Sequence, residues 1–179
     1  MKNNNFYKKI YKKKQILLTH SISLLSNNFP YSIDYDGKVT KHYDPKYWSE
    51  YLKHPIDKHI IPILLLNEGW LYTDSKTGKK IIWTGKIYPR GENEVIYHEW
   101  RNNFHYASYP LLQIESTIKL CKELCEKFKI PRKCIGHNSK VDGIEKFNGI
   151  TTRSNYLSEY YDLSPAFPFI FLKKQIEKK

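Results

Sequence analysis

Apolar residues fall into two short blocks and one long periodic segment, which predict the main elements of the fold. The run within residues 15–22 predicts a strand, and the continuous block 60–66 predicts a central strand buried on both faces. Pro62 interrupts that block and predicts a bulge or a sheet edge there. Residues 111–129 carry apolar side chains at helical spacing and end before Pro131, which predicts the longest helix.

Turn residues divide the rest of the chain. Asp36-Gly37 predicts a hairpin over residues 31–43, and a second hairpin over 69–85 is expected to turn near 75–78. Asp44-Pro45 predicts a short helix over 46–52. The aromatic and polar segment 86–109 is expected to be an irregular binding loop.

These elements together predict an α/β fold in one domain, with a mixed central β-sheet on which helix 111–129 and shorter helices pack. We expect a basic N-terminal arm (residues 1–14), a domain over 15–170 and a basic C-terminal tail (171–179) that is either a short helix or frayed. The cysteines Cys121, Cys125 and Cys134 are expected to be reduced and buried.

Charge adds a class of partner to this picture. Thirty Lys and Arg residues against 18 Asp and Glu give a net charge of +12, which predicts attraction to polyanions. The alternative is a composition rich in Lys, Asn, Ile and Tyr with no bearing on binding. The first residues are too polar for a secretory signal, and no segment is expected to span a membrane, so we expect synthesis in the cytoplasm.

Two residues carry candidate chemistry. Cys134–Gly136 is expected to form a buried strand that delivers His137 to a sheet edge, and a long loop returns Asp162 before the segment LSPAFPF. A histidine and a carboxylate are ordinary zinc ligands, and a catalytic zinc site needs three such groups and one open position. The alternative is that His137 forms a structural hydrogen bond and Asp162 caps a turn.

Several segments, taken in order, resemble the zinc-dependent N-acetylmuramoyl-L-alanine amidases, a family that includes phage lysozyme-type amidases and peptidoglycan recognition proteins. These segments are YSIDYDGKVTKHYDPKYWSEYL, IIPILLLNEGWL, LQIESTIKLCKELCEKFKIPRKCIGHN and YDLSPAF. The resemblance implies that fold from about residue 15 to 169. It also implies a zinc that polarises a water to attack the amide between muramic acid and L-alanine.

Carried over by the resemblance, His137 and Asp162 are two zinc ligands, and the first ligand position falls on Thr19. A shifted register would let His20 serve instead, although neighbouring strand residues face opposite sides of a sheet. Other departures fall on Phe29, Pro30, Leu64, Tyr51 and Tyr160. Leu64 stands where the family has a glutamate, so a general base is missing.

Three hypotheses follow. The first is an amidase fold that has lost or reduced its activity and serves as a structural or wall-binding component, for example of a bacteriophage virion. The second is an active zinc amidase with His20, His137 and Asp162 as ligands, and with Tyr160, Arg153 or His105 as acid or base. The third is a basic nucleic-acid-binding protein, although no motif for that function is present. The partners considered are peptidoglycan, virion subunits, further copies of the chain and nucleic acid.

Overall fold

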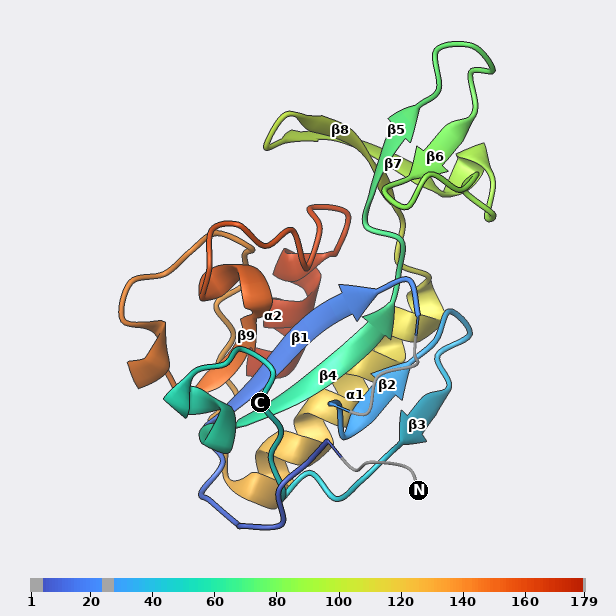
Figure 1. Ribbon diagram of the computed structural model, residues 1–179. Helices are drawn as coiled ribbons and strands as arrows, with labels where there is room; N and C mark the ends of the chain where they lie inside the picture. Colours follow the sequence, from blue (N-terminus) through green and yellow to red (C-terminus); the bar gives the residue numbers. More distant parts are fainter. Residues whose placement is uncertain (1–4, 24–27, 179) are drawn as a thin grey trace.

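A five-stranded sheet forms the centre of the computed structural model, which describes residues 5–23 and 28–178 (Figure 1). Its strand order is β3-β2-β4-β1-β9, and all neighbours are parallel except β2 and β3. The strands are β1 (Gln15–Ser21), β2 (Tyr31–Ile33), β3 (Val39–Lys41), β4 (Ile60–Leu66) and β9 (Gly149–Thr152). The mixed α/β fold expected from the sequence is therefore confirmed.

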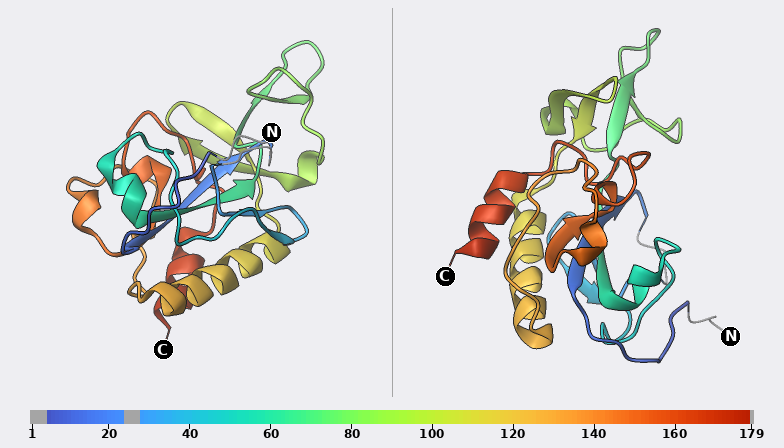
Figure 2. Two further views of the ribbon diagram at one scale, coloured as in Figure 1. Left: turned by 60° about the horizontal axis from the view of Figure 1, so that its bottom comes forward. Right: turned by 90° about the vertical axis from the view of Figure 1, so that its left-hand side faces the viewer.

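Two helices, α1 (Leu111–Phe128) and α2 (Phe169–Glu177), lie side by side on one face of this sheet (Figure 2). Alternation along β1 divides the core between the two faces. Ile16 and Leu18 belong to the large cluster that includes both helices, whereas Leu17 packs with residues of the segment 52–60 on the opposite face. Neither described helix has the length and apolar character needed to cross a bilayer.

A second, four-stranded antiparallel sheet extends beyond the end of β4 (Figure 1). Its order is β6-β5-β8-β7, formed by β5 (Trp70–Thr73), β6 (Lys80–Ile82), β7 (Val95–Trp100) and β8 (Asn103–Ala107). Gly69 links the two sheets with a φ of +74°, and its carbonyl accepts a hydrogen bond from the Ala107 amide at 2.9 Å. The hairpin expected over 69–85 is confirmed by β5 and β6.

The expected irregular loop over 86–109 is wrong, because most of it forms β7 and β8. The turn between these strands uses Arg101 and Asn102, which both have positive φ values of 51° and 60°. Two consecutive positive φ values suit a two-residue hairpin turn, which is usually marked by Asn-Gly or Asp-Gly rather than Arg-Asn. The sequence signal for this hairpin was therefore absent.

The N-terminal arm lies against the segment that precedes β4. The Tyr7 amide donates to the Trp48 carbonyl at 2.7 Å, and the two rings stack with centroids 4.3 Å apart. The buried Lys13 ammonium donates to the carbonyls of Tyr47, Lys58 and Ile60 at 2.8, 3.2 and 3.1 Å. The helix expected over 46–52 is wrong. These residues form turns and bends, and Trp48 forms an isolated bridge with Tyr7 of the arm. A 3-10 helix follows at Pro55–His59.

One further expectation is wrong, and two others are resolved between their alternatives. Cys134–Gly136 is not a strand, since only Cys134 forms an isolated bridge, to Ile150, and β9 occupies the sheet edge beside β1. Pro62 lies in continuous pairing with β1, so it forms no bulge, but β2 pairs with β4 only from Ile63 onward. The expected edge is therefore confirmed on that side of β4, as far as the described residues show. Of the two alternatives for residues 171–179, the structure has the helix, since most of this segment lies within α2, and residues 1–4 of the expected arm lie outside the described residues.

Candidate functional site

The carboxyl ends of β1 and β9 meet at one edge of the central sheet. Leu18 pairs with Thr152, so the next residues along the two parallel strands are Thr19 and Arg153. A short 3-10 helix, η4 (Arg153–Asn155), starts there and is fixed by a capping box between Thr152 and Asn155. Parallel pairing therefore brings Thr19 and Arg153 to neighbouring positions at this edge.

Thr19 is fully buried and faces the side of the sheet away from α1 and α2, as Leu17 does. Its hydroxyl donates to Asp162 Oδ2 in a short hydrogen bond. Thr19 Oγ1 also lies 2.8 Å from the Tyr51 hydroxyl, which must then be the donor. Burial raises the pKa of Tyr51, so this phenol keeps its proton at neutral pH.

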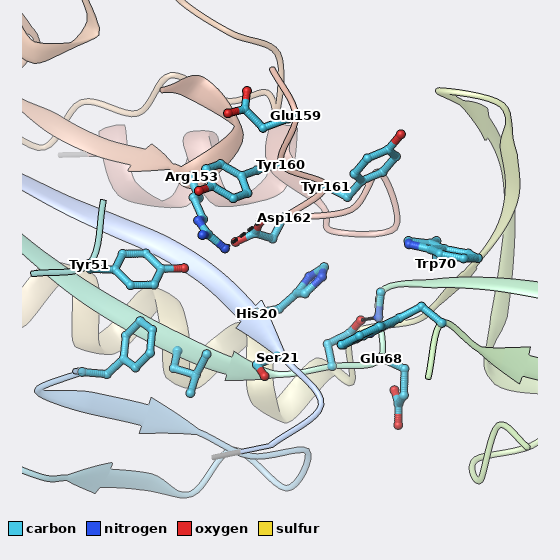
Figure 3. Close-up of a pocket in the computed structure, with 15 residues that line it drawn as sticks. His20, Ser21, Tyr51, Glu68, Trp70, Arg153, Glu159, Tyr160, Tyr161 and Asp162 are labelled. Carbon is cyan, nitrogen blue, oxygen red and sulfur yellow. Dashed lines mark hydrogen bonds and ion pairs between the residues drawn. The ribbon is translucent and has the colours of Figure 1, made fainter. Parts of the chain in front are cut away.

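Asp162 reaches the strand ends from the loop that follows η4. Its backbone carbonyl accepts a hydrogen bond from the Ser154 amide at 3.0 Å, and the residue is 6% exposed. Its Oδ1 lies 3.9 Å from Arg153 Nη1. Figure 3 shows the Arg153 and Asp162 side chains pointing toward one another, with the Tyr51 ring on the opposite side of the gap from Trp70.

Arg153 is held by aromatic rings. Its guanidinium carbon lies 3.4 Å from the Tyr160 ring centroid and 5.0 Å from that of Tyr51. A guanidinium stacks readily on an aromatic face, and its N–H groups, which lie in its own plane, stay available to acceptors. Among the described residues, the guanidinium forms no hydrogen bond, and its Nε is buried without an acceptor.

His20 points to the other face of β1, as strand alternation requires. Its Nδ1 lies 2.6 Å from the Tyr109 hydroxyl, which precedes α1. Burial lowers the pKa of His20; Asp162 opposes this shift and Arg153 reinforces it. The ring is therefore neutral near pH 7. On the far side of the ring, a Cβ added to Gly69 would lie 2.8 Å from Nε2.

These residues surround a pocket of about 550 Å³, which we call the strand-end pocket. It is lined by His20, Ser21, Phe29, Tyr51, Leu64, Asn67, Glu68, Gly69, Trp70, Trp83, Arg153, Glu159, Tyr160, Tyr161 and Asp162. Trp70 begins β5 and Trp83 directly follows β6, so both tryptophans come from the second sheet, whereas the strand-end residues come from the central sheet. The pocket thus lies where the two sheets meet.

A second arginine joins the sheets beside this pocket. Arg90 donates to Glu94 Oε2 at 2.7 Å and to the Ser108 carbonyl at 2.6 Å, and its Nη2 lies 3.3 Å from Glu68 Oε2. Glu68 Oε1 accepts a hydrogen bond from the Tyr35 hydroxyl at 2.5 Å. The Glu68 carboxylate, which lines the pocket, is therefore tied to the second sheet.

The structure brings together only part of the ligand set proposed from sequence. His20 and Asp162 both line the strand-end pocket, but His137 is exposed and lies outside it. His137 Nδ1 accepts a hydrogen bond from the Ser139 amide at 3.2 Å, and its carbonyl accepts from the Asn155 side chain at 2.9 Å. The zinc-ligand role of His137 stays a prediction.

The remaining acid and base candidates separate in the same way. Tyr160 and Arg153 line the pocket. His105 lies in β8, packs edge-on against Tyr97 with centroids 5.7 Å apart, and does not line it. Arg153 was expected only as an acid or base, and the short β-branched run Ile150–Thr152 is the local sign that a strand ends there.

The donor set at the strand ends does not fit a zinc ion. A catalytic zinc needs three nitrogen, sulfur or oxygen ligands that converge on one point. Here a threonine hydroxyl and a guanidinium take the two strand-end positions, and a guanidinium has no lone pair to offer a metal. Within residues 5–23 and 28–178, no group of three or more His, Cys, Asp or Glu residues is arranged to hold a metal.

Comparison with known proteins identifies the relatives of this chain. The family model Amidase_2, described as N-acetylmuramoyl-L-alanine amidase, matches residues 3–147. The matched range ends before β9, so Arg153 and Asp162 lie outside it. No match was found among curated proteins.

Solved amidase structures share the fold at low sequence identity. The amidase LysC from Clostridium intestinale URNW is 10% identical with a TM-score of 0.54, over 94% of this chain and 88% of that one. The amidase AmiD from E. coli, in complex with anhydro-N-acetylmuramic acid-L-Ala-D-gamma-Glu-L-Lys, is 13% identical with a TM-score of 0.57. That match covers 94% of this chain and 59% of AmiD.

Proposed function

The chain belongs to the N-acetylmuramoyl-L-alanine amidase family, and we propose that it binds peptidoglycan fragments in the strand-end pocket without hydrolysing them. One observation carries the proposal. The two adjacent strand ends at the pocket present Thr19 and Arg153, and both are engaged with Asp162. Resemblance to the family leads us to expect histidine ligands at strand ends of this kind.

The chemistry of these side chains argues against hydrolysis. Cleaving an amide requires an activated water and a group that accepts a proton. A guanidinium stays protonated and cannot act as a base, and the Thr19 hydroxyl already donates to Asp162. Leu64 lines the pocket at the position where the resemblance leads us to expect a glutamate.

The shape of the pocket supports retained binding. Two tryptophans and two tyrosines (Trp70, Trp83, Tyr160 and Tyr161) contribute flat apolar faces beside the polar groups at the strand ends. Concave sites that combine aromatic walls with a few placed polar groups are typical of ligand pockets. A peptidoglycan fragment offers both a sugar ring and a peptide to such a surface.

We propose that the chain is a structural or wall-binding component of a bacteriophage virion and that it uses this pocket to bind the cell wall. The support is compositional: the chain is rich in Lys, Asn and Tyr and carries a net charge of +12. Detection of the chain in purified virions together with other virion proteins would support this setting. Its recovery as a secreted protein of a bacterial host would contradict it.

The binding proposal is tested by sedimentation with purified peptidoglycan, zinc analysis and assay of released L-alanine peptides on one preparation. We expect the chain to sediment with peptidoglycan equally well with and without EDTA, and to release no peptide. Trp83→Ala should weaken binding, because this side chain is 54% exposed at the pocket.

Two results would contradict the proposal of binding without hydrolysis. One zinc per chain, lost in His137→Ala, together with release of L-alanine peptides from muropeptides, would establish an active zinc amidase with His20, His137 and Asp162 as ligands. Absence of sedimentation with peptidoglycan would contradict binding itself.

A further inference from the structure

The Arg153 guanidinium faces the strand-end pocket with unused hydrogen-bond donors. A guanidinium carries five N–H groups in a planar fork. Among the described residues, the one polar side-chain contact of Arg153 is the ion pair with Asp162, at 3.9 Å, which is too long for a hydrogen bond. The side chain is 25% exposed and lines the pocket. A ligand in the pocket can therefore supply the missing acceptor.

The position of these donors is fixed. Tyr160 stacks on the guanidinium at 3.4 Å, Tyr51 lies on it at 5.0 Å, and the capping box at η4 holds the backbone of Arg153. A stacked guanidinium loses little further side-chain entropy when it donates to a ligand. Arg153 is thus preorganised to bind an acceptor.

Asp162 places an acceptor beside these donors. Its Oδ2 accepts the Thr19 hydrogen bond, whereas its Oδ1 is the atom that faces Arg153. The two charges balance, and a ligand carboxylate at this point would also meet the negative charges of Asp162 and Glu159. A neutral ligand group with both an acceptor and a donor suits the pair better.

One extended peptide residue has this arrangement, because its N–H and C=O point to the same side of the backbone. We propose that the Arg153–Asp162 pair binds the backbone of the L-alanine that is attached to muramic acid. Arg153 donates to the carbonyl of this residue, and Asp162 Oδ1 accepts its N–H. This assignment rests on the proposed binding of peptidoglycan fragments, and it makes the pair a peptide-binding element.

The test is calorimetric titration of the chain with N-acetylmuramoyl-L-alanyl-D-isoglutamine. Arg153→Gln should weaken binding by about tenfold to a hundredfold, and Arg153→Lys by less, because a lysine keeps some donors in a different geometry. Arg132→Gln is the matched control: Arg132 is exposed and lies outside the pocket, so its removal should leave the affinity unchanged.

A second titration isolates Asp162. In the ester analogue, L-lactate replaces L-alanine, so the N–H is lost while the carbonyl stays. The unmodified chain should bind this ester about tenfold more weakly than the amide, and Asp162→Ala should bind ester and amide equally. If thermal unfolding shows that the alanine variant does not fold, Asp162→Leu serves in its place, because leucine has a similar branched shape and no acceptor.

The outcomes separate this inference from the proposed function. Normal binding of the amide, with no effect of Arg153→Gln or of the ester, would overturn the peptide contact and leave peptidoglycan binding in place. Release of L-alanyl-D-isoglutamine would overturn the non-hydrolytic function, while the ester and variant effects would still uphold the contact. Absence of any binding by the unmodified chain would overturn both.

Discussion

Arg90 and Arg153 both stand beside carboxylates at the strand-end pocket, but they use their terminal nitrogens differently. Those of Arg90 contact Glu94, Ser108 and Glu68 at 2.6–3.3 Å, and its side chain is 10% exposed. Those of Arg153 have one partner within residues 5–23 and 28–178, Asp162 at 3.9 Å, and its side chain is 25% exposed. The Nε atoms of both lack an acceptor in the described part of the chain, so the two arginines differ in their terminal nitrogens.

The difference assigns the two residues to different tasks. Arg90 joins the end of β4 to the second sheet, and both of its terminal nitrogens already have partners within the chain. Arg153 is held in place by rings and leaves its donors facing the pocket. An arginine whose donors are satisfied internally stabilises the fold, whereas one whose donors are not satisfied is available for binding.

The largest effect is expected from breaking the satisfied arginine. Arg90→Gln leaves the buried Glu68 carboxylate without its ion pair, which typically lowers the free energy of unfolding by about 3–5 kcal/mol. Urea unfolding measures the change, and Arg132→Gln should shift it by no more than about 0.5 kcal/mol. A loss below about 1 kcal/mol in Arg90→Gln would show that this arginine does not hold the sheets together.

Removing the Thr19 hydroxyl should have a smaller effect. Thr19→Val keeps the shape of the side chain but takes a donor from the buried Asp162, at a cost of about 1–3 kcal/mol. Thr19→Ser retains the hydroxyl and should lose less. Urea unfolding of the two variants compares them directly, and equal losses would mean that packing rather than the hydrogen bond matters here.

Lys13 is a buried cation whose donors are satisfied by backbone carbonyls, and its burial makes the stability of the chain depend on pH. Burial lowers its pKa to about 8 from 10.5, and Asp57 partly opposes the shift. Between these values the unfolded chain binds more protons than the folded chain, so stability should rise with pH, by no more than about 1.4 kcal/mol per pH unit.

Urea unfolding at pH 7, 8 and 9.5 checks the sign of this dependence. Lys13→Met has no group to titrate, so its stability should lack this rise. The same pH dependence in the variant and in the unmodified chain would contradict the assignment to Lys13.

The smallest effect on stability is expected for the unsatisfied arginine. Arg153→Gln removes a long ion pair that is partly open to solvent, so unfolding should change by about 1 kcal/mol or less. Urea unfolding of Arg153→Gln and Arg90→Gln under the same conditions measures the difference between the two losses of unfolding free energy. If both variants lose several kcal/mol, the two arginines have the same structural role and the contrast drawn from their hydrogen bonds fails.

Local signals in the sequence predicted much of the fold. The block 60–66 is β4, the helix expected over 111–129 is α1, and the turn at Asp36-Gly37 joins β2 and β3. Each of these elements is specified by its own apolar period or turn residues. The β7–β8 hairpin was missed because Arg101 and Asn102 adopt a turn conformation that their residue types rarely mark.

The candidate site was harder to predict because it depends on pairing between distant strands. Asp162 and His20 were expected near a common site, and both line the pocket. Arg153 reaches it only because β9 pairs with β1 in parallel, which no local pattern near residue 153 specifies. Gly136-His137 resembles a family motif, but the strand at this edge of the sheet, beside β1, is β9.

Gly69 gives the second sheet an unexpected dependence on the first. Gly69, which precedes β5, lies against the His20 ring and has a φ of +74°. A Cβ added to it would lie 2.8 Å from His20 Nε2, so no other residue fits there without displacing the ring. The segment from β5 to β8 therefore cannot be replaced by another segment without regard to the residue at its junction with β4. A graft of another hairpin pair onto this scaffold would have to inherit the junction glycine, or it would remodel the cavity it was meant to leave intact.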